Sequence, residues 1–185
     1  SGSGFGLTAY AVIALLENKD DIRQAKKAEV KSAVDKALGY LQRKALESED
    51  PYQLAVTVYA LTQADQTADI TGSITRILTR LDGLAIKEGG TTHWTKPVAE
   101  EKKKSEMDWY HPRPASVDVE MTAYVLLTYA ARKDNVNGLP ILKWLANQRN
   151  ENGGFSSTQD TVLGLQAMAD FGALIYSPSR SIDVT

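Results

Sequence analysis

The stretch Gly153-Gly154-Phe155-Ser156-Ser157-Thr158-Gln159-Asp160-Thr161 predicts a corner between two helices. Apolar residues recur at helical spacing before it, in 139–150, and after it, in 160–171, where Gly172 is expected to end the helix. Adjacent glycines suit a helix end because glycine adopts the left-handed backbone at little cost, and we expect that conformation at Gly153 or Gly154. Ser157 and Asp160 have the spacing of a capping box. The residues interpreted as this structural corner are Gly153, Gly154, Phe155, Ser157 and Asp160, with Phe155 turned inward.

The composition of the chain is typical of a soluble globular domain. Its 185 residues are 43% hydrophobic and 24% charged, and the net charge of −2 gives no basic field to attract nucleic acid. The longest apolar run, Leu7 to Leu16, has about ten residues, fewer than the ~18 that a membrane span needs. The chain has no cysteine, which excludes disulfides, cysteine nucleophiles and thiolate zinc sites.

Two kinds of helical segment alternate along the chain. Four segments are apolar around most of their circumference and are predicted to be buried helices: 7–17, 52–64, 117–131 and 160–171. Three others carry apolar residues on one face only: 28–47, 70–84 and 139–150. Asp50 and Pro51 are expected to begin the second buried helix, as its N-cap and first-turn residue.

The buried segments are also internal repeats. Ala14, Ala60, Thr128 and Ala167 fall in register, at offsets of 46, 68 and 39 residues. Repeats of about 40 residues built from helix pairs indicate stacked hairpins, and buried inner helices favour a ring over an open solenoid. The sequence therefore predicts an all-α fold, a partial α/α toroid. Four inner and three outer helices make about half a ring, so we expect the other half upstream or from another chain.

The connection 85–116 interrupts this pattern with glycines, prolines and a charged run. Thr91 to Thr95 is expected to pair with Met107 to His111 as a hairpin. Such a hairpin would bring His93 and His111 together as metal ligands with Asp108 as a third. We favour instead two partly exposed loop histidines, because a third fixed ligand is not evident.

No other residues form a convincing catalytic set. The chain lacks a G-x-S-x-G nucleophile turn. Asp118 and Glu120 are explained by the positive end of a helix dipole, and Tyr10, Tyr124 and Tyr129 by burial in the core. We therefore predict no catalytic, cofactor-binding or metal-binding residue from the sequence itself.

Four segments resemble, in the same order, the thioester-containing domain of the α2-macroglobulin and complement C3 superfamily. They are LTAYAVIALLE at Leu7, HWTKP at His93, VDVEMTAYVLLTYA at Val117, and WLANQRNENGGFSSTQDTVLGLQAMADFGA from Trp144 to Ala173. The resemblance implies an α/α toroid of six helix pairs, of which residues 7–177 are the C-terminal half. Residues 178–185, ending in SIDVT, resemble the strand that leaves the domain for a β-sandwich, and residues 1–6 are interpreted as a linker or artificial end.

In that family a Cys and a Gln of a GCGEQ motif form a thioester that acylates a protease or target surface. This chain has neither the cysteine nor the motif, so no catalytic residue is carried over. Complement members carry carboxylates directly after the tryptophan that matches Trp94, and this chain has Thr95 and Lys96 at those positions. The resemblance is closer to the macroglobulin branch. It implies that the chain is a non-enzymatic part of a secreted protease inhibitor or opsonin and that it binds no cofactor. In the parent protein it would adjoin β-sandwich domains.

Two alternatives remain open at the sequence level. Toroid enzymes such as prenyltransferase β-subunits and terpene cyclases also use GGF corners, although the former need a zinc-binding cysteine and Asp20-Asp21 is a poor acidic motif for the latter. The other alternative is a non-catalytic interaction module.

Overall fold

The computed structural model describes residues 3–23, 26–96, 116–149 and 154–176. Within them the fold is all-α, apart from one small hairpin. The elements are α1 (Ser3–Glu17), the 3-10 turn η1 (Lys19–Asp21), α2 (Lys27–Glu47), α3 (Pro51–Gln63), α4 (Ala68–Leu84), β1 (Ile86–Glu88), β2 (Thr91–His93), α5 (Ser116–Ala131), α6 (Asn135–Asn147) and α7 (Thr158–Tyr176). None of the helices in the described part of the chain is long and apolar enough to cross a membrane.

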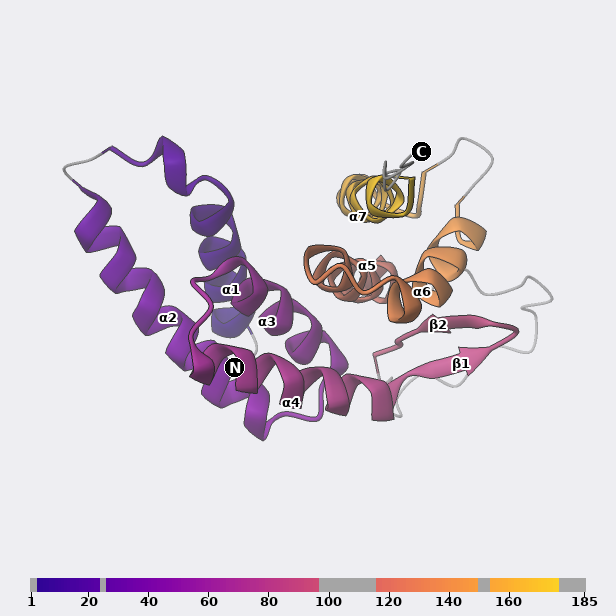
Figure 1. Cartoon of the computed structure of the whole chain (residues 1–185), viewed down its shortest axis with the longest axis horizontal. Coiled ribbons are helices and arrows are strands. Elements are labelled where there is room, and N and C mark those ends of the chain that lie inside the picture. Colours follow the sequence, from indigo (N-terminus) through magenta and orange to yellow (C-terminus); the bar gives the residue numbers. More distant parts are fainter. Residues whose placement is uncertain (1–2, 24–25, 97–115, 150–153, 177–185) are drawn as a thin grey trace, which may run out of the picture.

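The helices are arranged in an arc of two layers (Figure 1). The inner layer is α1, α3, α5 and α7, in which each helix packs against the next. The outer layer is α2, α4 and α6, which cover the convex side of the arc. The alternation of inner and outer helices that the sequence pattern predicts is thus present, and closure of a ring stays a prediction.

Position in the arc decides how far each inner helix is buried. The two middle helices are buried on nearly all sides: α3 buries Leu54 to Leu61 without a break, and α5 buries Met121 to Thr128. The end helices keep an exposed apolar flank, with Leu7 72% exposed on α1 and Val162 62% exposed on α7. The expectation of burial on all sides is therefore wrong for α1 and α7, because each has an inner neighbour on one side only.

Helix starts follow the local sequence closely. The Asp50 carboxylate accepts the Tyr52 amide at 2.9 Å, with Pro51 in the first turn, as the sequence predicts. The Thr67 hydroxyl accepts the Ile70 amide at 3.3 Å to begin α4. Each cap satisfies an amide that has no partner inside the helix.

Two helices extend beyond their predicted bounds. Helix α1 begins at Ser3 rather than Leu7, and the side chain of Phe5 in its first turns is 5% exposed. Helix α7 continues through Gly172 to Tyr176, so the prediction that Gly172 ends it is wrong. A glycine within a helix costs only about 1 kcal/mol relative to alanine, and the following turn packs Leu174 against the core.

The hairpin after α4 differs in its pairing from the expected one. Thr91–His93 pairs in antiparallel fashion with Ile86–Glu88, a pairing that was not predicted from the sequence. Gly89 and Gly90 make the two-residue turn at φ +57° and +74°, a conformation that favours glycine. The segment Met107 to His111 lies outside the described residues, as do Gly153 and the expected exit strand 178–185.

Candidate functional site

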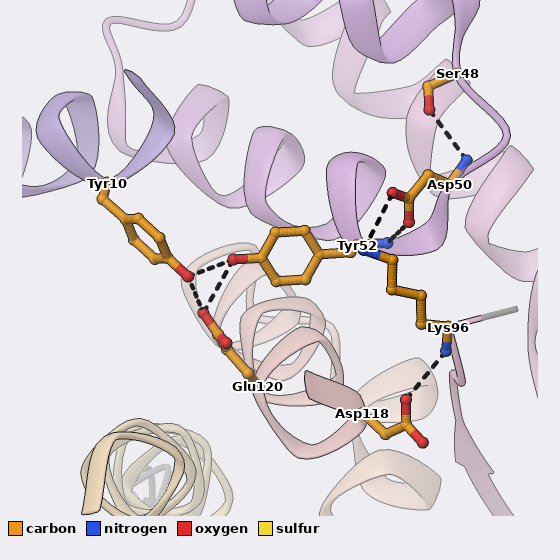
Figure 2. A network of polar contacts seen from close by, with 7 residues as sticks. All are labelled: Tyr10, Ser48, Asp50, Tyr52, Lys96, Asp118 and Glu120. Carbon is orange, nitrogen blue, oxygen red and sulfur yellow. Dashed lines mark hydrogen bonds and ion pairs between the residues drawn. The ribbon is translucent and has the colours of Figure 1, made fainter. Parts of the chain in front are cut away.

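The inner face of the arc holds a cluster of two phenols and one carboxylate, drawn from three helices (Figure 2). Tyr10 on α1 donates to Glu120 on α5, and Tyr52 on α3 donates to the same carboxylate oxygen over 3.2 Å. The two phenol oxygens also lie within hydrogen-bonding contact of each other, so their two hydroxyl protons are shared among three contacts. The cluster therefore ties three consecutive inner helices through side chains that lie up to 110 residues apart in the sequence.

The protonation states of this cluster follow from its burial. Burial, followed by the hydrogen bond to Glu120, raises the pKa of Tyr10 to about 12, against the opposite effect of hydrogen bonds with Tyr52 and Gln159. Burial and the hydrogen bond with Tyr10 raise the pKa of Tyr52 further. At neutral pH both phenols are proton donors. Hydrogen bonds to a charged group contribute about 1.5–3 kcal/mol each, so the cluster is a strong clamp between helices.

A second phenol–carboxylate pair lies further along the same helices. The Tyr59 hydroxyl on α3 donates to Glu17 at the end of α1, at 2.7 Å. Burial and this hydrogen bond raise the pKa of Tyr59 well above its usual value. The ring of Tyr59 also lies 5.5 Å from that of Tyr124 on α5, centroid to centroid. Helices α1 and α3 are thus joined by polar contacts at two levels.

The residue Lys96 fastens the end of the hairpin to the starts of two inner helices (Figure 2). Its backbone amide donates to Asp118 at 3.0 Å, and its ammonium lies 3.9 Å from Asp50 and 5.7 Å from the centroid of the Tyr52 ring. Trp94, two residues earlier, is 2% exposed and donates from Nε1 to the Leu81 carbonyl at 2.7 Å. Lys96 therefore contacts one acid through its side chain and a second acid through its backbone amide.

The corner before α7 is built around two buried side chains. The Ser157 amide donates to Asp160 Oδ1 at 2.6 Å and the Asp160 amide donates to Ser157 Oγ at 3.3 Å, the reciprocal pattern of a capping box. Asp160 is 1% exposed and Phe155 is 6% exposed. Burial acts to raise the pKa of Asp160, but hydrogen bonds from Ser157 and Ser156 outweigh it, so the pKa is lowered.

The left-handed backbone expected at Gly153 or Gly154 can be compared with the structure at Gly154 alone. Gly154 does not adopt the left-handed conformation, and the residues after it are held by the Phe155 amide, which donates to Thr161 Oγ1 at 2.8 Å. The other candidate for that conformation, Gly153, lies outside the described residues. A Cβ added at Gly154 would lie 3.1 Å from Thr161 Oγ1, so the corner favours glycine for space.

The histidine site considered from the sequence is only partly within the described residues. His93 stacks on Trp144 of α6 with centroids 4.6 Å apart and ring planes 6° from parallel, and burial lowers its pKa. Its possible co-ligands His111 and Asp108 lie outside the described residues. Among the residues that the structure describes, no group of three or more His, Asp or Glu residues could hold a metal ion.

Sequence reasoning found the corner and the core tyrosines but not the cluster. Tyr10 and Tyr124 lie in or against the core, as predicted. Glu120, assigned to a helix dipole, instead accepts hydrogen bonds from Tyr10 and Tyr52. A glutamate within an otherwise apolar helix face was the available signal, since a partly buried carboxylate favours hydrogen-bond donors around it.

Comparison with known proteins identifies the family of the chain. The family model of the A-macroglobulin TED domain matches residues 2–171. The chain is 33% identical over 179 residues, 97% of its length, to "Thioester-containing protein 1 allele R1" of Anopheles gambiae, and covers 11% of that protein. It is 35% identical over 154 residues, 83% of its length, to complement C3 of Lethenteron camtschaticum, and covers 8% of that protein. Its arc of alternating helices is the fold on which these matches fall, and the chain belongs to the A-macroglobulin TED domain family.

Proposed function

We propose that this chain is the supporting half of a thioester domain in a secreted protein of the A-macroglobulin family. The observation that carries the proposal is the family match over 170 residues of a chain that contains no cysteine. A thioester needs a cysteine thiol, so in this proposal the reactive group belongs to another part of the parent protein. The chain itself performs no catalysis and supplies a rigid frame of helices.

The exposed flanks of α1 and α7 support this role. Large apolar side chains lie on both: Leu7 and Leu15 on α1, and Val162 and Leu165 on α7. Soluble proteins seldom leave such surfaces bare, and further helices of the parent would cover them and complete a ring. Covering the ring interior excludes water, which would preserve a thioester that water otherwise hydrolyses.

We further propose protease trapping as the activity of the parent. The strings GGFSSTQDT and EMTAYVLL, which resemble the macroglobulin branch, favour trapping over opsonisation. The family match favours both over a toroid enzyme of the prenyltransferase or cyclase type. The partners in this proposal are the attacking protease and the neighbouring β-sandwich domains of the same protein.

The test uses the parent protein that contains this chain. Methylamine should release one thiol per protomer and add its mass to a peptide outside the 185 residues, while the isolated chain should gain no mass. After incubation with a protease, trapping predicts that cleavage of a small peptide substrate persists and cleavage of a large protein is lost. Covalent deposition on a cell surface without that size selection would show opsonisation instead, and absence of a methylamine-sensitive thiol would contradict the thioester assignment.

A further inference from the structure

A cavity of about 260 Å³ lies between α1 and α2, away from the cluster on the inner face. Helices α1 and α2 diverge toward their connection, as Figure 1 shows. The apolar wall of the cavity consists of Leu15, Leu16, Ile22, Val30, Val34 and Leu38. Apart from Leu15, which also belongs to the exposed flank of α1, no residue of the proposed thioester role lines this cavity.

The cavity follows from the unequal lengths of the two helices. Val30, Val34 and Leu38 lie three or four residues apart and form one apolar stripe along α2. The stripe is covered at its lower levels, where Val34 and Leu38 are 6% and 5% exposed. Helix α1 ends at Glu17, so the first turns of α2 have no helix opposite them and Val30 stays partly exposed.

The mouth of the cavity is charged but electrically balanced. Three lysines and three aspartates line it: Lys19, Lys27, Lys31, Asp20, Asp35 and Asp65. Lys31 lies 3.0 Å from Asp65 and 3.9 Å from Asp35, so its ion pairs span from α2 to the end of α3. Equal numbers of both signs give an ionic ligand no net attraction, whereas a hydroxyl or amide would find both donors and acceptors.

The volume of the cavity limits the size of the ligand that it can hold. An apolar cavity of about 150 Å³ in another protein holds benzene, so about 260 Å³ corresponds to roughly ten carbon atoms. We propose that the α1–α2 cavity is a binding site for a small uncharged amphiphile, with about ten apolar carbons placed against Val34 and Leu38 and one hydrogen-bonding group at the charged mouth.

The test titrates the full 185-residue chain with 2-naphthol, which has ten carbons, one hydroxyl and its own fluorescence. We expect saturable binding with one site per chain at pH 7. Val34→Phe fills the floor of the cavity and should weaken binding at least tenfold. Val30→Phe, nearer the mouth, should do the same and is the deciding variant if Val34→Phe fails to fold. Leu84→Phe adds comparable bulk at an exposed position of α4 outside the cavity and should leave binding unchanged.

Charged analogues test the balanced mouth. 2-Naphthoate and a naphthyl trimethylammonium ion should each bind at least fivefold more weakly than 2-naphthol, because neither sign is favoured and each loses hydration. Non-saturable binding of 2-naphthol, or equal binding to the wild type and Val30→Phe, would overturn the site. A charged analogue that binds more tightly than 2-naphthol would overturn the ligand class. These results are independent of the methylamine experiment, so the two proposals can fail separately.

Discussion

The ring of Phe155 lies directly on Gly164, where an added Cβ would come within 2.5 Å of ring atom Cε2. The same helix makes a matching contact near its other end, where a Cβ added at Gly138 of α6 would lie 2.1 Å from the Phe171 ring. Both rings are buried. Helix α7 is thus held by two aromatic rings that each require a glycine opposite, one from the corner and one toward α6.

The first prediction is that Gly164→Ala destabilises the chain by about 1–3 kcal/mol, since the methyl group overpacks a buried ring. Gly172→Ala is the matched control in the same helix, because no atom lies within 4 Å of its added Cβ. There alanine should be neutral or stabilising by up to about 1 kcal/mol through helix propensity. Thermal unfolding of both variants gives the comparison, and equal effects would refute the specific contact.

The second prediction concerns the corner in the parent protein. Phe155→Ala removes a buried aromatic ring and should cost about 3–5 kcal/mol of unfolding free energy. In a domain of this size each kcal/mol lowers the melting temperature by roughly 2–4 °C. If the corner holds α7 so that the domain shields its thioester, the variant should also lose methylamine-reactive thioester faster on storage. Unchanged stability combined with lost partner binding would identify the corner as a recognition surface instead.

The third prediction is an acid sensitivity that depends on Asp160. Its pKa is lowered in the folded chain, so its contribution to stability is present above the ordinary value of 3.8 and is lost as pH falls through the folded value. Asp160→Asn should therefore reduce stability at pH 7 and flatten the decline between about pH 5 and pH 2. Urea unfolding at a series of pH values measures this. A parallel offset at every pH would mean that the carboxylate charge contributes nothing.

Local signals account for the parts of the fold that the sequence predicts well. The Asp50 cap with Pro51, and the capping-box spacing of Ser157 and Asp160, depend on residues within four positions of one another. Helix periodicity likewise reports on each helix separately. The failures at α1 and α7 are of a different kind, because exposure of Leu7 and Val162 depends on which neighbour is present and not on the helix itself.

The candidate site could not be predicted because its partners are distant in the chain. Glu120 accepts from residues 68 and 110 positions away, and no local pattern pairs a phenol with a carboxylate at such separations. The hairpin shows the same limit on a smaller scale. Two adjacent glycines predict a turn, but the sequence did not reveal that Thr91–His93 pairs with the preceding strand Ile86–Glu88.

The last prediction follows from the shared carboxylate of the cluster. Tyr10→Phe and Tyr52→Phe each remove one donor to Glu120, and Glu120→Gln removes the charge that both phenols meet. Each single change should cost about 1–3 kcal/mol. The double variant Tyr10→Phe/Glu120→Gln should cost less than the sum, because the two residues act in one network. Tyr176→Phe, at a phenol that is 85% exposed, is the control and should change stability by less than 0.5 kcal/mol.

Alkaline titration tests the same cluster, because the raised pKa of Tyr10 predicts the direction in which stability changes with pH. The pKa of Tyr10 is raised from 10.0 to about 12, so its contribution to stability is complete below pH 10 and is lost as pH rises toward 12. Wild-type chain should therefore destabilise between pH 10 and pH 12 more steeply than Tyr10→Phe, and tyrosinate absorbance should show a late-ionising phenol that this variant lacks. If the wild type and Tyr10→Phe lose stability with the same slope over that interval, Tyr10 ionises freely and the clamp between α1, α3 and α5 does not exist in solution.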